Sequence, residues 1–118
     1  MKYAVLMFSE PAHTKAMSED ELAEILDKHE VLRNELTRSG ELLNGAGLAY
    51  PEDTTVLRLE GDGVVARRGP LLSADEHVTA YYVIECESHD RAREIAGRTL
   101  DHHVTAVELR EIHDTAGF

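Results

Sequence analysis

The sequence predicts a single α+β domain, and three observations support this prediction. Two segments with helical periodicity alternate with segments of strand character, a glycine-centred hairpin pattern lies between them, and no repeat or long linker interrupts the chain. A chain of 118 residues is long enough for one domain and too short for two. We therefore expect one domain over residues 1–118.

The chain opens with an apolar segment, residues 3–8, that is typical of a buried central strand. The next segment, residues 9–14, contains Pro11 and is expected to be a loop.

A long helix is predicted from Ser18 to about Ser39. Ser18 with Glu21 matches a capping box, and Gly40 stands where a left-handed stop is expected. One apolar stripe recurs at spacings of three and four residues along this helix: Leu22, Ile25, Leu26, His29, Leu32 and Leu36.

The middle of the chain predicts a strand and then a hairpin. Residues 41–49 form a strand pattern that contains Gly45 and Gly47, and residues 51–53 form a turn. Residues 54–67 alternate in polarity around Gly-Asp-Gly, which favours a β-hairpin.

The last part predicts strand, helix and strand. Residues 78–85 are rich in β-branched and aromatic side chains. Ser88 is the expected cap of a helix over residues 90–100, and residues 104–112 alternate as a closing strand.

Without the hairpin, the predicted order is β-α-β-β-α-β, which is the ferredoxin-like pattern. Both helices of such a sandwich lie on one face of the sheet. An apolar open face is usually covered by a second subunit. We therefore expect a homodimer through the open sheet face, associated as a dimeric α/β barrel.

The composition restricts the partners of this protein. Lys and Arg number 12 against 23 Asp and Glu, so the formal net charge is −11. A surface this acidic repels phosphate backbones and anionic membranes. The apolar N-terminal stretch is also too short for a signal peptide or a membrane span. We expect a cytoplasmic protein without nucleic-acid or membrane partners.

Several short motifs of the chain are similar to those of a known family. In the run from His29 to Leu48, HEVLRNELTRSGELLNGAGL, a helix with an internal His ends at a Gly before a strand of the type E-L-L/V-x-G-x-G-L, and this run resembles the corresponding segment of the YCII-related family. The opening residues 1–6, the strand 81–85 and the helix after Ser88 are similar as well. Residues 67–71, RRGPL, resemble the Asp-Gly-Pro-Phe motif of one branch, with Arg68 and Leu71 in place of Asp and Phe.

The resemblance implies a ferredoxin-like fold, dimers built on the sheet and an intracellular bacterial protein. For YCII-type members it also implies a His–Asp pair as a suggested active site. It implies no particular reaction, because the family has no settled general one.

His29 is the principal catalytic candidate. It lies on the apolar stripe of the first helix, where burial can tune an imidazole as a general base, and it matches the family's helical His. A His base needs an orienting carboxylate. Glu52 and Asp53 follow the glycine-rich strand, and Asp53 is the favoured partner because that strand leaves room for a ligand. The alternatives are a core histidine and a solvated turn residue.

Four further residues are candidates for substrate binding. Gly45 and Gly47 permit a close ligand approach, although a β-bulge explains them equally. Arg68 can receive an anionic group, or can form a salt bridge at a strand end. Tyr82 faces the opposite side of its strand from Tyr81, where it can serve as a proton donor or as a packing residue.

No cofactor or metal is predicted. The pair His102-His103 has no chelating spacing with His113, because adjacent side chains on a strand point apart. Cys86 lies between acidic residues in an apolar context, which favours a packing role over a catalytic thiol.

These observations leave more than one function open. The first hypothesis is a small cofactor-free enzyme that uses His29 and Asp53 for acid–base chemistry on a small organic molecule. The alternative is a non-catalytic dimeric protein that binds a ligand or serves as an accessory. A third is a stress-related or regulatory partner of a transcription system.

Overall fold

A computed structural model describes all residues of the chain, 1–118, and confirms an α+β architecture. The elements in chain order are β1 (Lys2–Ser9), α1 (Pro11–Lys15), α2 (Glu19–Arg38), β2 (Leu42–Gly47), the 3₁₀ turn η1 (Pro51–Asp53), β3 (Thr55–Glu60), β4 (Gly63–Arg68), β5 (His77–Glu85), α3 (His89–Gly97) and β6 (Ala106–Glu111).

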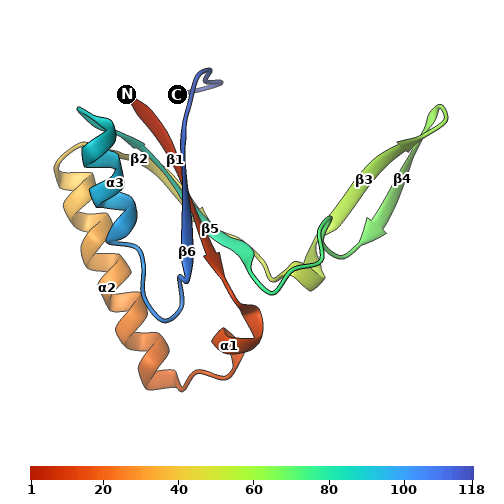
Figure 1. Cartoon of the computed structure of the whole chain (residues 1–118), viewed down its shortest axis with the longest axis horizontal. Helices are drawn as coiled ribbons and strands as arrows, with labels where there is room; N and C mark the ends of the chain where they lie inside the picture. The colour runs from red at the N-terminus through yellow and green to blue at the C-terminus, as the bar shows by residue number, and fades with distance from the viewer.

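Four strands form one antiparallel sheet in the order β2-β5-β1-β6. The first strand lies inside this sheet, as the apolar N-terminal segment predicts. Both chain ends therefore lie at the same edge of the fold, where β1 and β6 begin and end side by side (Figure 1).

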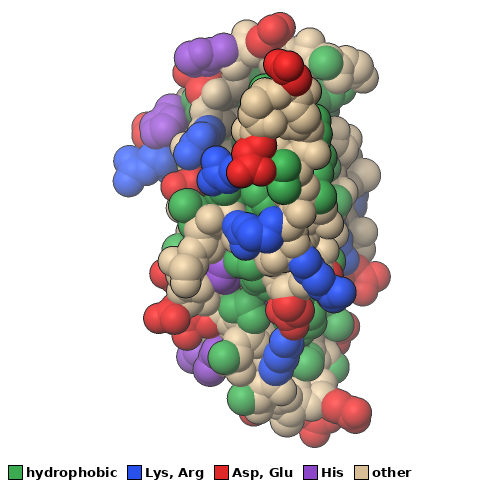
Figure 2. Space-filling model, turned by 90° about the vertical axis from the view of Figure 1, so that its right-hand side faces the viewer, with side chains coloured by type: hydrophobic (Ala, Val, Ile, Leu, Met, Phe, Trp, Pro, Cys, Tyr) green, Lys and Arg blue, Asp and Glu red, His purple; other side chains and the backbone are tan.

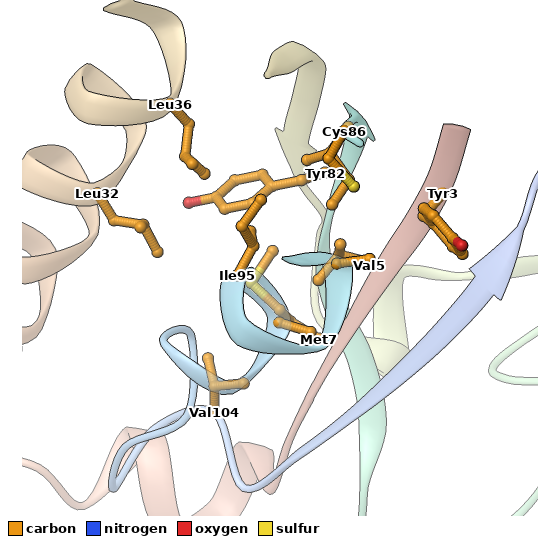
Figure 3. Packing of buried hydrophobic residues seen from close by; sticks show 12 residues of the cluster. Tyr3, Val5, Met7, Leu32, Leu36, Tyr82, Cys86, Ile95 and Val104 are labelled. Carbon is orange, nitrogen blue, oxygen red and sulfur yellow. The ribbon is translucent and has the colours of Figure 1, made fainter. Parts of the chain in front are cut away.

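The two long helices, α2 and α3, cover one face of the sheet (Figure 1). The core lies between these layers, with side chains from β1, α2, β5 and α3 directed toward one another (Figure 3). Its buried members are Tyr3, Val5, Met7, Leu32, Leu36, Tyr82, Ile84, Cys86, Ala92, Ile95, Ala96 and Val104.

Helix α2 begins and ends as its sequence predicts. The Ser18 hydroxyl accepts the backbone N–H of Glu21 at 3.1 Å, and Gly40 has φ +79°. The predicted apolar stripe is buried only in the second half of the helix, at His29, Leu32 and Leu36. In the first half Leu22 and Ile25 are only half-buried and Leu26 is 63% exposed, because α2 extends there beyond the end of the sheet (Figure 1).

The expectation of a loop over residues 9–14 was wrong, because Pro11–Lys15 forms the short helix α1. Pro11 stands at the start of the helix, where a missing N–H costs nothing and the fixed φ suits the first turn. Proline here therefore begins a helix. The buried Thr14 anchors α1 to the rest of the fold.

The predicted hairpin forms as β3 and β4, and it projects away from the main sheet (Figure 1). The strand register places Leu57, Leu59, Val64 and Ala66 on one face of this hairpin. Leu57, Leu59 and Val64 are 64%, 77% and 67% exposed. Figure 2 looks at the molecule from this side and shows hydrophobic side chains exposed among charged ones. The hairpin thus carries an apolar face that nothing in the same chain covers.

None of the helices combines the length and the apolar character needed to cross a membrane.

Candidate functional site

A cavity of about 720 Å³ opens between α1, α2 and the end of the main sheet. This volume is in the range of sites for small organic molecules. Half of its lining is hydrophobic, and the uncovered first half of α2 forms one of its walls. The polar side chains of its lining define what the cavity can bind and do: Ser9, Thr14, His29, Arg33, Tyr50, His77, Thr79, Tyr82 and His103.

His29 lies in the wall of this cavity and is bonded to Asp101. The His29 side chain is 9% exposed, and its Nε2 lies 3.0 Å from Oδ2 of Asp101. An ionised carboxylate only accepts hydrogen bonds, so Nε2 carries the proton and donates it to Asp101. The lone pair of the neutral ring is therefore on Nδ1, which has no hydrogen-bond partner in the protein.

Asp101 is held rigidly in the turn after α3. Its Oδ1 accepts the backbone N–H groups of His103 and Val104, both at 2.7 Å, and Nζ of Lys28 lies 3.3 Å from Oδ2. Burial acts to raise the pKa of this carboxyl, but the two N–H donors and Lys28 together hold the pKa below its ordinary value. Asp101 is thus an anion at neutral pH.

Burial lowers the pKa of His29 below its ordinary value, and the Asp101 carboxylate offsets this only in part. Lys28 and His103 lower the His29 pKa further. The imidazole is therefore neutral at pH 7, which is the state that a general base requires.

Tyr82 and Arg33 bring a phenol and a guanidinium to the same cavity. The Tyr82 hydroxyl points from β5 toward α2, between Leu32 and Leu36 (Figure 3). Burial raises the pKa of this phenol, and Arg33 opposes the rise. Tyr82 is therefore a neutral hydrogen-bond donor at pH 7.

Three more polar residues line the cavity near its α1 end: Ser9, Thr14 and His103. Nδ1 of His103 lies 2.9 Å from Oγ1 of Thr14, so the unpredicted helix α1 orients this imidazole. The Ser9 hydroxyl is fully enclosed and has no hydrogen-bond partner in the protein, and no other fully enclosed side-chain oxygen or nitrogen lacks one. Polar atoms of this kind are uncommon in folded proteins.

The structure does not bring Asp53, the expected partner, to His29. Oδ1 of Asp53 accepts a hydrogen bond from Nη2 of Arg68 at 3.0 Å, and both side chains are more than half exposed. Arg68 also donates to the carbonyl of Glu52 and so ties β4 to η1 at the base of the hairpin. Neither side chain lines the cavity, and the carboxylate beside His29 is Asp101.

The other three predicted binding residues, Gly45, Gly47 and Tyr82, do line the cavity. Gly45 lies directly against Tyr82, and a Cβ at this position would come within 2.8 Å of the Tyr82 ring. At Gly47 a Cβ would meet nothing within 4 Å. Packing thus requires glycine at position 45, whereas the space beside Gly47 in the cavity wall is unfilled.

Asp101, His103 and Arg33 were missed as site residues. Asp101 lies in the turn after α3, beside His102 and His103, which were considered only as metal ligands. Arg33 is four residues after His29, and this helical spacing was the available indication. Cys86 is buried as expected, its pKa is raised by burial, and it does not line the cavity.

Comparison with known proteins gives the family. The model of the YCII-related domain matches residues 1–114. The chain belongs to the YCII-related family. An uncharacterized protein of Rhizobium meliloti (strain 1021) is 26% identical over 96 residues, which are 81% of this chain and 77% of that protein. Membership of the Asp-Gly-Pro-Phe branch of the YCII-related proteins stays a prediction.

Proposed function

We propose that this YCII-related protein is a small enzyme that moves a proton on a small organic molecule. His29 is the general base, acting through Nδ1, and Asp101 orients the ring and stabilises the imidazolium that forms. Tyr82 donates a hydrogen bond to the oxygen on which negative charge develops. Lyase, isomerase and hydrolase steps that begin with proton abstraction all fit this set of groups.

One observation carries the proposal: an imidazole, bonded to a largely buried carboxylate at 3.0 Å, stands at the wall of a cavity of small-molecule size. A general base of this kind needs its second ring nitrogen free, and Nδ1 of His29 has no protein partner. A histidine that served only the core would be expected to use both nitrogens.

Exchange of carbon-bound hydrogen tests the proposal without knowledge of the physiological reaction. We would incubate the protein in D₂O with a panel of small ketones and carboxylic acids and follow deuterium incorporation by NMR. Wild-type protein is expected to catalyse exchange in at least one compound, and His29→Gln is expected to abolish it. Asp53→Asn is the control and should retain full activity, because Asp53 does not line the cavity and is bonded to Arg68. If His29→Gln retains the exchange, His29 is not the base. If wild-type protein exchanges none of the compounds, the cavity is that of a non-catalytic binding protein.

We also infer that the main sheet and the helices α2 and α3 form a ferredoxin-like sandwich that dimerises. The β-α-β-β-α-β order that remains without α1 and the hairpin supports the first part. The register places Leu6, Phe8 and Tyr81 on the face away from the helices, which supports a second copy there. A two-stranded hairpin is only marginally stable alone. The exposed apolar face of the β3–β4 hairpin therefore supports a contact between this hairpin and the second copy.

A further inference from the structure

Arg33 is the cationic side chain of the cavity, and it forms no ion pair. An arginine that lines a cavity without a carboxylate partner can bind an anionic ligand there. Glu30 stands three residues before it, at a spacing that permits a helical ion pair, yet the pair does not form. The Arg33 guanidinium instead lies near the Tyr82 phenol. It is therefore free to receive an anion from the cavity.

The position of Arg33 relates it directly to His29. Four residues separate them, so their side chains leave the same face of α2 one turn apart. This spacing is roughly 6 Å along the helix axis. A small organic molecule held at Arg33 by an anionic group could consequently extend along this face of α2 toward His29.

The remaining walls distinguish between anions. Apolar side chains such as Met7, Ile25 and Leu42 surround the polar groups, which suits an organic body. A single guanidinium balances one negative charge. The two charges of a phosphate ester would leave one uncompensated, because no second Lys or Arg lines the cavity. A carboxylate matches the planar guanidinium and carries only one charge.

We propose that the cavity binds a small organic acid, with its carboxylate on the Arg33 guanidinium and its apolar part along the wall formed by α2 and β2. This inference rests on the proposed function in one respect, namely that the reacting atom of the bound acid lies beside His29. Binding itself depends on Arg33.

Binding of benzoate, measured by NMR titration of the full chain, tests the inference. Arg33→Leu removes the charge and keeps most of the apolar stem. It is expected to weaken benzoate binding roughly 10- to 100-fold, the loss typical of a charge-assisted hydrogen bond. Benzamide, which is neutral and of the same shape, should bind wild type as weakly as benzoate binds Arg33→Leu. Benzoate binding to wild type should also weaken as salt is added.

Arg38→Leu is the matched control. Arg38 lies on the same helix, makes no ion pair and does not line the cavity, so its loss changes the net charge equally. Benzoate should bind Arg38→Leu as tightly as wild type. Equal weakening in both variants, equal binding of benzamide and benzoate, or tighter binding of inorganic phosphate than of benzoate would each overturn the inference.

The test separates this inference from the proposed function. His29→Gln should abolish deuterium exchange and still bind benzoate, because Arg33 is intact. If His29→Gln loses exchange while Arg33→Leu binds benzoate as tightly as wild type, the acid–base role of His29 is supported. The binding of an organic acid at Arg33 is then rejected. A wild type that binds benzoate through Arg33 but exchanges nothing would remove the acid–base role alone.

Discussion

Gly45 of β2 and Tyr82 of β5 are register partners, and the glycine backbone lies against the tyrosine ring. A Cβ on Gly45 would stand 2.8 Å from Cδ1 of Tyr82 and 2.9 Å from the carbonyl oxygen of Tyr81. The second contact is with backbone, which cannot move aside. This glycine therefore sets how closely the wall of the cavity approaches the phenol.

Gly45→Ala is expected to destabilise the protein by about 1–3 kcal/mol, the usual cost of inserting a methyl group into a filled space. Gly47→Ala, two residues along the same strand, should change stability by less than about 0.5 kcal/mol, because the added methyl meets nothing. Urea unfolding followed by circular dichroism measures both. Equal effects of the two substitutions would show that the contact with Tyr82 does not govern this position.

The ion pair between Glu41 and Arg91 joins the start of β2 to α3. Both oxygens of Glu41 accept from the Arg91 guanidinium at 2.8 Å, and both side chains are largely buried. We expect Glu41→Gln to cost about 1.5–3 kcal/mol. Glu94→Gln removes the other partner of Arg91, which is 64% exposed, and should cost less than about 1 kcal/mol. Denaturant unfolding of both variants at pH 7 makes the comparison.

Glu41 also makes stability depend on pH in the acid range. The Arg91 hydrogen bonds lower its pKa from 4.5 to about 2. A carboxyl whose pKa is depressed by folding contributes stability above its unfolded pKa, and this contribution is lost as the pH falls through the folded value. Wild type should therefore lose stability between pH 4.5 and about 2 more steeply than Glu41→Gln does. Parallel curves for the two proteins would contradict the assignment.

Asp101→Asn is expected to lower the pKa of His29 further, because the carboxylate that partly offsets the effect of burial is removed. Asparagine keeps an oxygen that can accept the N–H groups of His103 and Val104, so the turn should persist. NMR titration of the His29 ring measures the change. Asp53→Asn provides the control and should leave the titration unaltered, because Asp53 is bonded to Arg68. A His29 pKa that responds to Asp53 and not to Asp101 would contradict the geometry of the site.

His29 makes the free energy of unfolding depend on pH below neutrality. Its pKa is lowered by folding, so the unfolded chain binds more protons than the folded one between the two values. Stability is therefore complete above the unfolded pKa of about 6.5 and declines as the pH falls toward the folded value. His29→Gln should remove this decline, which thermal melts between about pH 5 and about pH 7 can measure.

The sequence by itself determined the regular elements of this protein, because their patterns are local. The Ser18 cap, Gly40, the alternation around Gly-Asp-Gly and the β-branched run before Cys86 each depend on neighbours within a few residues. The structure follows these patterns at α2, at the β3–β4 hairpin and at β5. His29 and Gly45 were also identified in this way, since helical spacing and a glycine within a strand are visible without a fold.

Only the tertiary structure decided which side chains meet at the site. His29 and Asp101 are separated by 72 residues, and His103 and Thr14 by 89. Such pairs depend on how α3 and its following turn lie beside α2 and α1, and local periodicity carries no information on this. Asp53 was the expected partner of His29 from its position in the sequence. In the structure it lies at the base of the hairpin and accepts a hydrogen bond from Arg68. A hydrogen bond forms only when two groups are placed to within a few tenths of an ångström. The packing of distant segments decides this placement, and therefore decides which carboxylate is the partner of His29.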